Sequence, residues 1–353
     1  MFSLFCVRLL LSRDFLLDVV TNELVEENLD CFKLISKAIK MPGFSTEQNF
    51  PQSPRKGLES CAIVACGGKY TFCYLPEKEE WKRLADGLSE RNEYTQMIIY
   101  RDRLFAFSSN VKAEKYDPVF DCWSTLDHLE LPTENPAMVT VVRGEICSIE
   151  IDTSSKQSTI KEFNVERCSW QTVLSSHEGC REASCVVAAG SHLYVCGGWF
   201  EGDCVAKAER FDTVENKWEE IANMQQARGY ACGVATGEKI FVAGGRKDGV
   251  SVSKTCEMYN ISTNEWQFIG SLKVPREDCR MMCLRGTLYV LGGTDEHGLS
   301  QLSVECYDPT EDKWIKKATI PVKMISKDNS DAFTGCVLKL SQGVLDKLDV
   351  IKE

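Results

Sequence analysis

The sequence has little of what most enzymes and metalloproteins need. It holds four histidines, His128, His177, His192 and His297, and no two of them have the spacing of a metal site. No CxxC pair, Walker loop, GxGxxG, GxSxG or sialidase-type aspartate box is present. We therefore expect no metal, no cofactor and no catalytic residue, and we predict that the protein is not an enzyme.

Basic residues are also in deficit. The 353 residues include 41 Lys and Arg against 52 Asp and Glu, for a net charge of −11. Nucleic acids and anionic membranes attract a basic face, so neither is an expected partner. No run of 18 apolar residues is present, and the first residues, MFSLFCVRLLL, lack the basic start and the cleavage site of a signal peptide.

Cysteines are numerous without forming a pattern. Many of the 18 stand alone in apolar runs, as Cys66, Cys196, Cys232 and Cys336 do. A free cysteine in such a run packs as a small hydrophobic residue. We predict a reduced chain in the cytoplasm.

Repetition is the main feature that the sequence does have. Six tryptophans recur every 42 to 48 residues, and each follows a Tyr or Phe by seven residues; the pairs are Tyr74 and Trp81, Tyr116 and Trp123, Phe163 and Trp170, Phe211 and Trp218, Tyr259 and Trp266, and Tyr307 and Trp314. Four repeats also carry a glycine pair after a short apolar run; these are Gly67-Gly68, Gly197-Gly198, Gly244-Gly245 and Gly292-Gly293. This period, with four short strands per unit, is typical of a β-propeller.

The boundaries follow from the repeats. Residues 59–340 supply six units, but the first unit lacks its first strand, and residues 333–340 are predicted to provide it and so close the ring. Residues 341–353 are expected to be a tail. Residues 1–44 have the apolar spacing of two short helices, and residues 45–58, rich in Pro, Ser and Gln, are the predicted linker.

The glycine pair, the aromatic residue and the tryptophan seven residues later resemble a Kelch repeat, and the chain is similar to the Kelch-like family. The resemblance implies an all-β fold, a six-bladed Kelch propeller with a short N-terminal helical segment. Val7 to Met41 resembles the end of the BACK domain, which precedes the propeller in that family. Members usually begin with a BTB domain, and no segment here resembles one.

The same resemblance implies a function in protein recognition. It points to the substrate-binding part of an adaptor for a cullin-3 RING ubiquitin ligase, in which the propeller holds a short peptide of the substrate. The BTB domain and the start of BACK dock the cullin in that family, so we expect this chain to have lost that docking. Two alternatives stay open: a non-degradative scaffold such as an actin-associated Kelch protein, and, ranked third, a propeller enzyme.

Candidate binding residues lie in two sets of loops. With the strands of a unit lettered A to D, the B–C and D–A loops share one face, and such loops commonly carry binding residues. The B–C loops are longer in the last three repeats. In Kelch-like proteins the position after the glycine pair often faces the bound peptide, and here it holds Lys69, Trp199, Arg246 and Thr294.

The D–A loops add further candidates. An arginine lies 16 residues before the glycine pair in the last three repeats, at Arg181, Arg228 and Arg276, and Tyr230, Glu277 and Asp278 lie just beyond these arginines. A repeated arginine can equally be structural, capping strand ends or pairing between blades, and this alternative stays open. The charges on these loops are mixed and give no sign for the partner.

Overall fold

The computed structural model describes residues 59–89, 95–108, 111–126, 138–152, 157–164, 169–178, 181–321 and 334–351. Contacts divide the chain into two units, Met1–Glu59 and Ser60–Glu353, and almost all described residues belong to the second. The helical segment predicted at residues 1–44 and the linker predicted at 45–58 lie outside the described residues.

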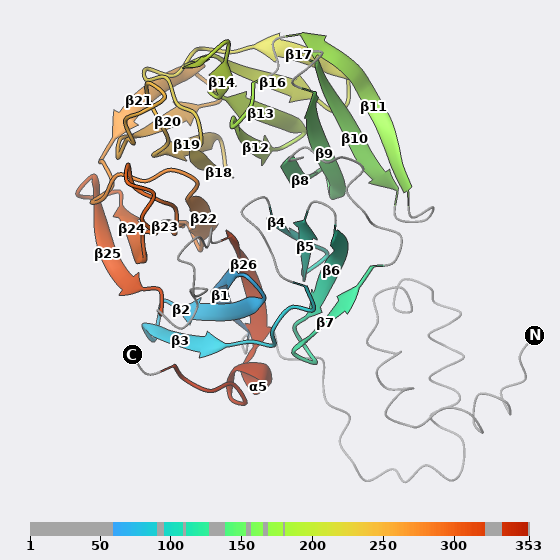
Figure 1. Cartoon of the computed structure of the whole chain (residues 1–353), viewed down its shortest axis with the longest axis vertical. Coiled ribbons are helices and arrows are strands. Elements are labelled where there is room, and N and C mark those ends of the chain that lie inside the picture. The colour runs from blue at the N-terminus through green and yellow to red at the C-terminus, as the bar shows by residue number, and fades with distance from the viewer. Residues whose placement is uncertain are drawn as a thin grey trace, which may run out of the picture. The chain divides into compact units, whose positions relative to one another are not determined.

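The described residues form six four-stranded antiparallel sheets, arranged as blades in a ring (Figure 1). Blades 1 to 3 contain β26 (Thr334–Ser341), β1 (Glu59–Gly67), β2 (Tyr70–Leu75), β3 (Glu80–Arg83); β4 (Gln96–Tyr100), β5 (Arg103–Ser108), β6 (Val111–Asp117), β7 (Cys122–Thr125); and β8 (Met138–Val142), β9 (Glu145–Asp152), β10 (Gln157–Asn164), β11 (Ser169–Glu178).

Blades 4 to 6 contain β12 (Cys185–Ala189), β13 (His192–Cys196), β16 (Ala208–Asp212), β17 (Lys217–Glu220); β18 (Cys232–Thr236), β19 (Lys239–Ala243), β20 (Cys256–Asn260), β21 (Glu265–Ile269); and β22 (Arg280–Leu284), β23 (Thr287–Leu291), β24 (Ser303–Asp308), β25 (Lys313–Thr319). A two-stranded hairpin of β14 (Trp199–Phe200) and β15 (Asp203–Cys204) projects from blade 4. The predicted six-bladed propeller is confirmed.

The first strands of the blades form the inside of the ring. β26, β4, β8, β12, β18 and β22 contact one another in that order, and β22 contacts β26 again. β26 pairs with β1, so the first blade takes its inner strand from the other end of the repeat region. The strand expected at residues 333–340 is found at Thr334–Ser341.

The segment expected as a tail packs against blade 1. It begins with the short helix α5 (Gln342–Leu345), whose Leu345 lies in the apolar cluster of blades 1 and 2. The buried Lys82 ammonium donates to the carbonyls of Leu345 at 2.8 Å and Leu348 at 3.0 Å. Ile351 N–H donates to the carbonyl of Trp81 at 2.9 Å. These contacts fix the chain end to the blade that it completes.

The repeated aromatic residues explain why the blades pack. In every blade the Tyr or Phe of strand C lies opposite the Trp of strand D, with ring centroids 5.0–5.4 Å apart. Such large rings bury much apolar area, and their tilted contacts add to it. The seven-residue spacing between the aromatic residue and the tryptophan therefore corresponds to the same ring contact in each blade.

A second contact joins neighbouring blades. The indole N–H of Trp123, Trp266 and Trp314 donates to the carbonyl of Ala85, Ala222 and Gly270, respectively, in the preceding blade, at 2.8–3.0 Å. The backbone N–H of each of those three residues donates in turn to a side-chain oxygen of Asp121, Asn264 or Asp312, at 2.6–2.8 Å. We call this reciprocal pair of bonds the inter-blade clamp. Through the clamp, both the backbone N–H and the backbone C=O of one residue find hydrogen-bond partners in the following blade.

Candidate functional site

Three of the predicted partner contacts, Arg181, Arg228 and Arg276, are instead interior residues. Their exposed fractions are 3%, 0% and 0%. Each guanidinium donates to the carbonyl of the first glycine of its own blade's pair, at 2.7, 2.8 and 3.0 Å. Each also pairs with a buried glutamate of strand C; these are Glu209, Glu257 and Glu305. The arginines hold loops to strands, and the prediction that they contact a partner is corrected.

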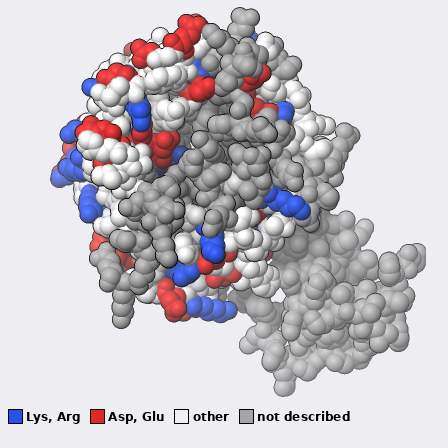
Figure 2. All heavy atoms as spheres, viewed as in Figure 1, with Lys and Arg blue, Asp and Glu red and all other residues white. Residues whose placement is uncertain are grey.

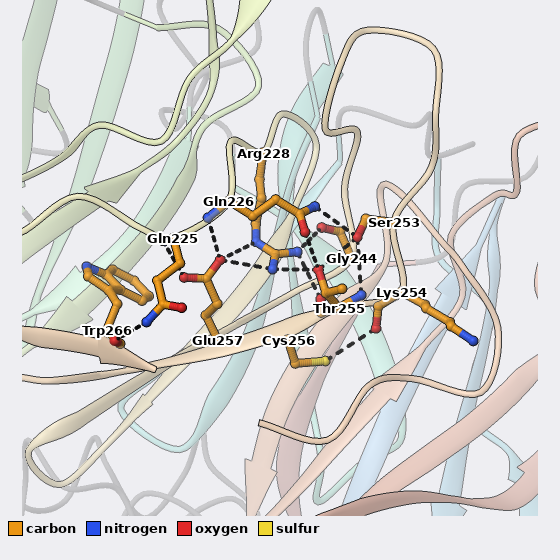
Figure 3. A network of polar contacts seen from close by, with 10 residues as sticks. All are labelled: Gln225, Gln226, Arg228, Gly244, Ser253, Lys254, Thr255, Cys256, Glu257 and Trp266. Atoms are coloured by element: carbon orange, nitrogen blue, oxygen red, sulfur yellow. Dashed lines mark hydrogen bonds and ion pairs between the residues drawn. The ribbon is translucent and has the colours of Figure 1, made fainter. Parts of the chain in front are cut away.

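The network around Arg228 shows how completely such an arginine is used (Figure 3). Its two terminal nitrogens donate to Thr255, to the carbonyl at 2.9 Å and to the hydroxyl at 2.7 Å. The carboxylate of Glu257 accepts from Nε and Nη2 of Arg228 at 3.2 and 3.0 Å. It also accepts the backbone N–H groups of Gln225 and Gln226 at 2.7 and 3.1 Å. The D–A loop is thereby fixed to strand C.

The glutamates were not predicted, although the sequence carries a signal for them. A Glu stands two residues before the strand C aromatic in four repeats, at Glu114, Glu209, Glu257 and Glu305, all at most 3% exposed. In blades 2 and 6 this carboxylate also accepts loop backbone N–H groups, from Ser89 and from Lys273, both at 2.7 Å. A fixed offset from the aromatic residue would have identified the position as structural.

The glycine pairs let the loops cross closely. Gly245 and Gly293 have φ of +83° and +84°. A Cβ at either position would lie 2.5 and 2.4 Å from the carbonyl oxygens of Gly229 and Glu277, respectively, which belong to the D–A loop of the same blade. Only glycine permits both the backbone angle and the approach. The B–C loop therefore leaves the blade directly above the D–A loop.

Backbone bridges fix the two loops together at this crossing. In each of blades 4 to 6 the residue after the glycine pair pairs with the residue after the buried arginine; the pairs are Trp199 and Glu182, Arg246 and Gly229, and Thr294 and Glu277. Their N–H···O distances are 2.6–2.9 Å. The position that faces the bound peptide in Kelch-like proteins is thus fixed where the B–C and D–A loops of the blade cross.

Near these loop crossings lies a hollow of about 340 Å³, and three consecutive blades contribute residues to its lining. Its lining residues are Glu182 and Trp199 of blade 4, Tyr230 and Arg246 of blade 5, and Glu277 and Asp278 of blade 6. Five of these six were candidates from the sequence. Glu182 was missed, although it follows Arg181 just as Glu277 follows Arg276.

The other candidates lie elsewhere. Lys69 is exposed in the two-residue turn between β1 and β2 and does not line the hollow. Thr294 does not line the hollow either, but its backbone pairs with that of Glu277, which does, and with that of Ser300. The structure therefore brings Trp199, Tyr230 and Arg246 together with Glu277 and Asp278, and leaves Lys69 apart.

Two aromatic residues, Trp199 and Tyr230, line the hollow. Trp199 is half-buried, and its six-membered ring lies over Gly249, where a Cβ would be 2.7 Å from Cη2. Tyr230 has a φ of +58° and is 39% exposed. Burial and the nearby negative charge of Asp278 raise the pKa of Tyr230. Both rings keep part of their surface open to a ligand.

Arg246 and Glu277 form an ion pair in the lining of the hollow. The guanidinium donates to both carboxylate oxygens of Glu277, with Nη2 to Oε1 at 2.7 Å. It also donates to the carbonyl of Gly249 at 3.1 Å and lies 5.9 Å from the centroid of the Tyr230 ring. The hydrogen bonds to Glu277 raise the pKa of Arg246. This bidentate pair is a rigid platform.

In the part of the chain that the structure describes, no group of three or more His, Cys, Asp and Glu is placed to hold a metal ion. The helices among those residues are all too short or too polar to cross a membrane.

Comparisons with known proteins agree with the propeller. Residues 139–337 match the family model described as the KLHDC2/KLHL20/DRC7 Kelch-repeats domain. Kelch-like protein 23 of Pongo abelii is 28% identical over 206 residues, which cover 56% of this chain and 35% of the relative. Kelch-like protein 25 of Xenopus tropicalis is 29% identical over 158 residues, covering 44% and 26%.

Human Kelch-like protein 33 is 35% identical over 128 residues, which cover 35% of this chain and 24% of that protein. The chain thus spans about a third or less of the length of these relatives. The solved structure of YjhT has a TM-score of 0.61 at 14% identity, over 73% of this chain and 96% of that one, and supports the fold alone. Because the Kelch model covers more than half of the residues, the chain belongs to the Kelch-like family.

Proposed function

We propose that this protein is a recognition module that holds a segment of a partner protein on the B–C and D–A loop face of blades 4 to 6. The observation that carries the proposal is the hollow, in which three blades place two partly exposed aromatic rings around a fixed ion pair. Aromatic and arginine residues in such pockets supply most of the binding energy at protein interfaces. The rigid loop crossings beneath them keep the cost of ordering low.

The test is a pair of matched alanine variants of the full chain. Partners are first captured with the wild-type protein and purified, and affinity and melting temperature are then measured for Trp199→Ala and Phe120→Ala. Phe120 is 62% exposed and lies in the turn between β6 and β7, a C–D turn on the opposite end of the blades. Trp199→Ala should weaken binding at least about tenfold, while Phe120→Ala should change it little.

Melting temperature separates binding from folding. Neither residue belongs to the repeated aromatic pairs, so both variants should melt close to the wild type, whereas Trp266→Ala should unfold its blade. Full affinity of Trp199→Ala would show that the partner binds elsewhere.

The finer proposal follows the family resemblance: the partner is a substrate of a cullin-3 RING ubiquitin ligase, and the protein acts in the cytoplasm. Depleting either this protein or cullin-3 in cells should then slow the turnover of the captured partner. Unchanged turnover in both cases would favour the non-degradative scaffold.

Cullin contact is tested separately. A purified cullin-3 fragment should not bind this chain if the docking surface lies in the BTB domain and the start of BACK, and firm binding would contradict that expectation.

An actin-associated role would be favoured by a basic, exposed outer blade edge, and a cosedimentation assay with actin tests it. The outer strands carry both signs: β25 has Lys313, Lys316 and Lys317, whereas β17 has Glu219 and Glu220. We therefore keep peptide recognition as the proposed function.

A further inference from the structure

The burial of the three arginines changes the charge of the loop face. We define the rim as the residues that follow each buried arginine and each glycine pair in blades 4 to 6: 182–183, 199–205, 229–230, 246–252, 277–278 and 294–301. It contains eight acidic residues, Glu182, Glu201, Asp203, Asp248, Glu277, Asp278, Asp295 and Glu296, against two basic ones, Arg246 and Lys247. With the arginines counted, the charges looked mixed; without them, the rim is acidic. In Figure 2 several groups of acidic side chains lie over the upper part of the view, with Lys and Arg side chains among them.

Inside the hollow the one cation is already neutralised. Arg246 is the only basic residue among the six that line it, and both of its bonds to a carboxylate go to Glu277, whose side chain is 5% exposed. The two further carboxylates, Glu182 and Asp278, are exposed at the edge of the hollow. The six residues together carry a net negative charge.

The aromatic rings of the hollow, like its net negative charge, favour a cationic ligand. Trp199 and Tyr230 line the hollow, and a cation is attracted to the face of either ring. The guanidinium of Arg246 lies 5.9 Å from the centroid of the Tyr230 ring, so one cation–aromatic contact is already present in the hollow and Trp199 is the ring left for an incoming cation. An anionic ligand would meet the carboxylates of Glu182 and Asp278, and the guanidinium of Arg246 already makes a bidentate pair with Glu277.

Resting on the proposed function, we propose that this hollow receives a lysine or arginine side chain of the partner, so that the module selects basic peptide segments. The incoming cation lies against Trp199 and pairs with Glu182 and Asp278, and no covalent step is involved. The volume of about 340 Å³ is at the low end for ligand pockets and suits a single long side chain. The acidic rim adds attraction at longer range and speeds the encounter.

The test uses three synthetic twelve-residue Gly-Ser peptides that differ at two central positions, with arginine, neutral citrulline or glutamate. They are titrated into the full chain, and the indole N–H signal of Trp199 is followed by NMR. Seven tryptophans give seven such signals, and Trp199→Phe identifies the one that matters. The arginine peptide should shift it saturably, at least fivefold more tightly than the citrulline peptide, and the glutamate peptide should leave it unmoved.

Two double variants with equal change in net charge locate the effect. Glu182→Gln with Asp278→Asn removes the carboxylates at the hollow, and Asp278, with a φ of +51°, tolerates asparagine. Glu201→Gln with Asp203→Asn removes two carboxylates of the same rim in or next to the β14–β15 hairpin, outside the hollow. The first pair should weaken the arginine peptide about fivefold or more, and the second pair less than twofold.

Several results would overturn the proposal. Equal shifts with arginine and citrulline, or a stronger shift with glutamate, would refute selection by charge while leaving the loop face as a peptide site. Equal weakening by the two double variants would reduce the effect to general electrostatics. No shift of Trp199 with the arginine peptide would refute the site for basic segments, whereas the affinity of the captured partner for Trp199→Ala judges the proposed function independently.

Discussion

Replacing Arg228 by methionine tests whether the repeated arginines are structural. The side chain is fully buried and donates five hydrogen bonds, to Gly244, Thr255 and Glu257. Methionine fills similar space without a charge. The change leaves Glu257, also 0% exposed, without its cation.

The magnitude follows from that uncompensated carboxylate. Removing one partner of a buried ion pair commonly costs about 3–5 kcal/mol of unfolding free energy. For a domain of this size the unfolding entropy is large, at about 2 cal/mol/K per residue, so the melting temperature should fall by about 5–8 °C. Adding Glu257→Gln should restore part of the loss, because glutamine still accepts a backbone N–H but carries no charge.

Calorimetry on four proteins gives the answer: wild type, Arg228→Met, the double variant, and Arg210→Met as the matched control. Arg210 also pairs with a glutamate, Glu219 at 2.7 Å, but the two side chains are 30% and 33% exposed. Exposed pairs contribute under about 1 kcal/mol. If Arg228→Met melts no lower than Arg210→Met, the buried network does not hold the loops as described.

Further outcomes are expected from the chain end, the cysteines and one aspartate. Deleting residues 334–353 removes β26 and α5 and exposes the edge of β1, so the protein should aggregate or melt far lower; a monodisperse product with an unchanged melting temperature would rule out this closure. Among the 14 cysteines that the structure describes, a thiol reagent should label Cys122 first and few others in the native state, because burial raises the pKa of Cys73, Cys147 and Cys256 to about 12. Rapid labelling of most of these 14, or mass evidence for disulfides, would count against a reduced, packed interior. Hydrogen bonds from Tyr307 and Gly270 lower the pKa of Asp312, so its stabilising contribution is present above about pH 4 and is lost as the pH falls through the lowered value. Asp312→Asn, which places the residue found at Asn264 of the preceding blade, should therefore reduce the dependence of the melting temperature on pH in that acid range. An unchanged dependence on pH would contradict this.

The fold was predictable because its determinants recur at fixed offsets. The strand C aromatic and the strand D tryptophan lie opposite each other in every blade, so a spacing of seven residues reports a direct contact. The inter-blade clamp was not predicted. Its acceptors, such as Asn264 and Asp312, look like ordinary turn residues in the sequence, and only the neighbouring blade reveals what they bond.

The candidate site was predictable in part, for a similar reason. Trp199 and Arg246 were predicted because they directly follow the glycine pair, where the B–C loop begins. Arg228 and Arg276 were predicted to contact a partner but are buried, because a repeated arginine has the same spacing whether it is buried or exposed. Its burial depends on the carbonyl 16 residues onward and on the strand C glutamate 29 residues onward, and the sequence shows neither contact.

The shared first blade also sets an order on synthesis. β1 ends at Gly67 and β26 begins at Thr334, so the ribosome makes the other five blades between them. At about 5–20 residues per second, β1 stays without its inner neighbour for on the order of 15–50 s. Its free edge is a template for pairing with another strand during that time. A nascent chain of this propeller is therefore most exposed to misassembly at the blade made first, which is also the last to be completed.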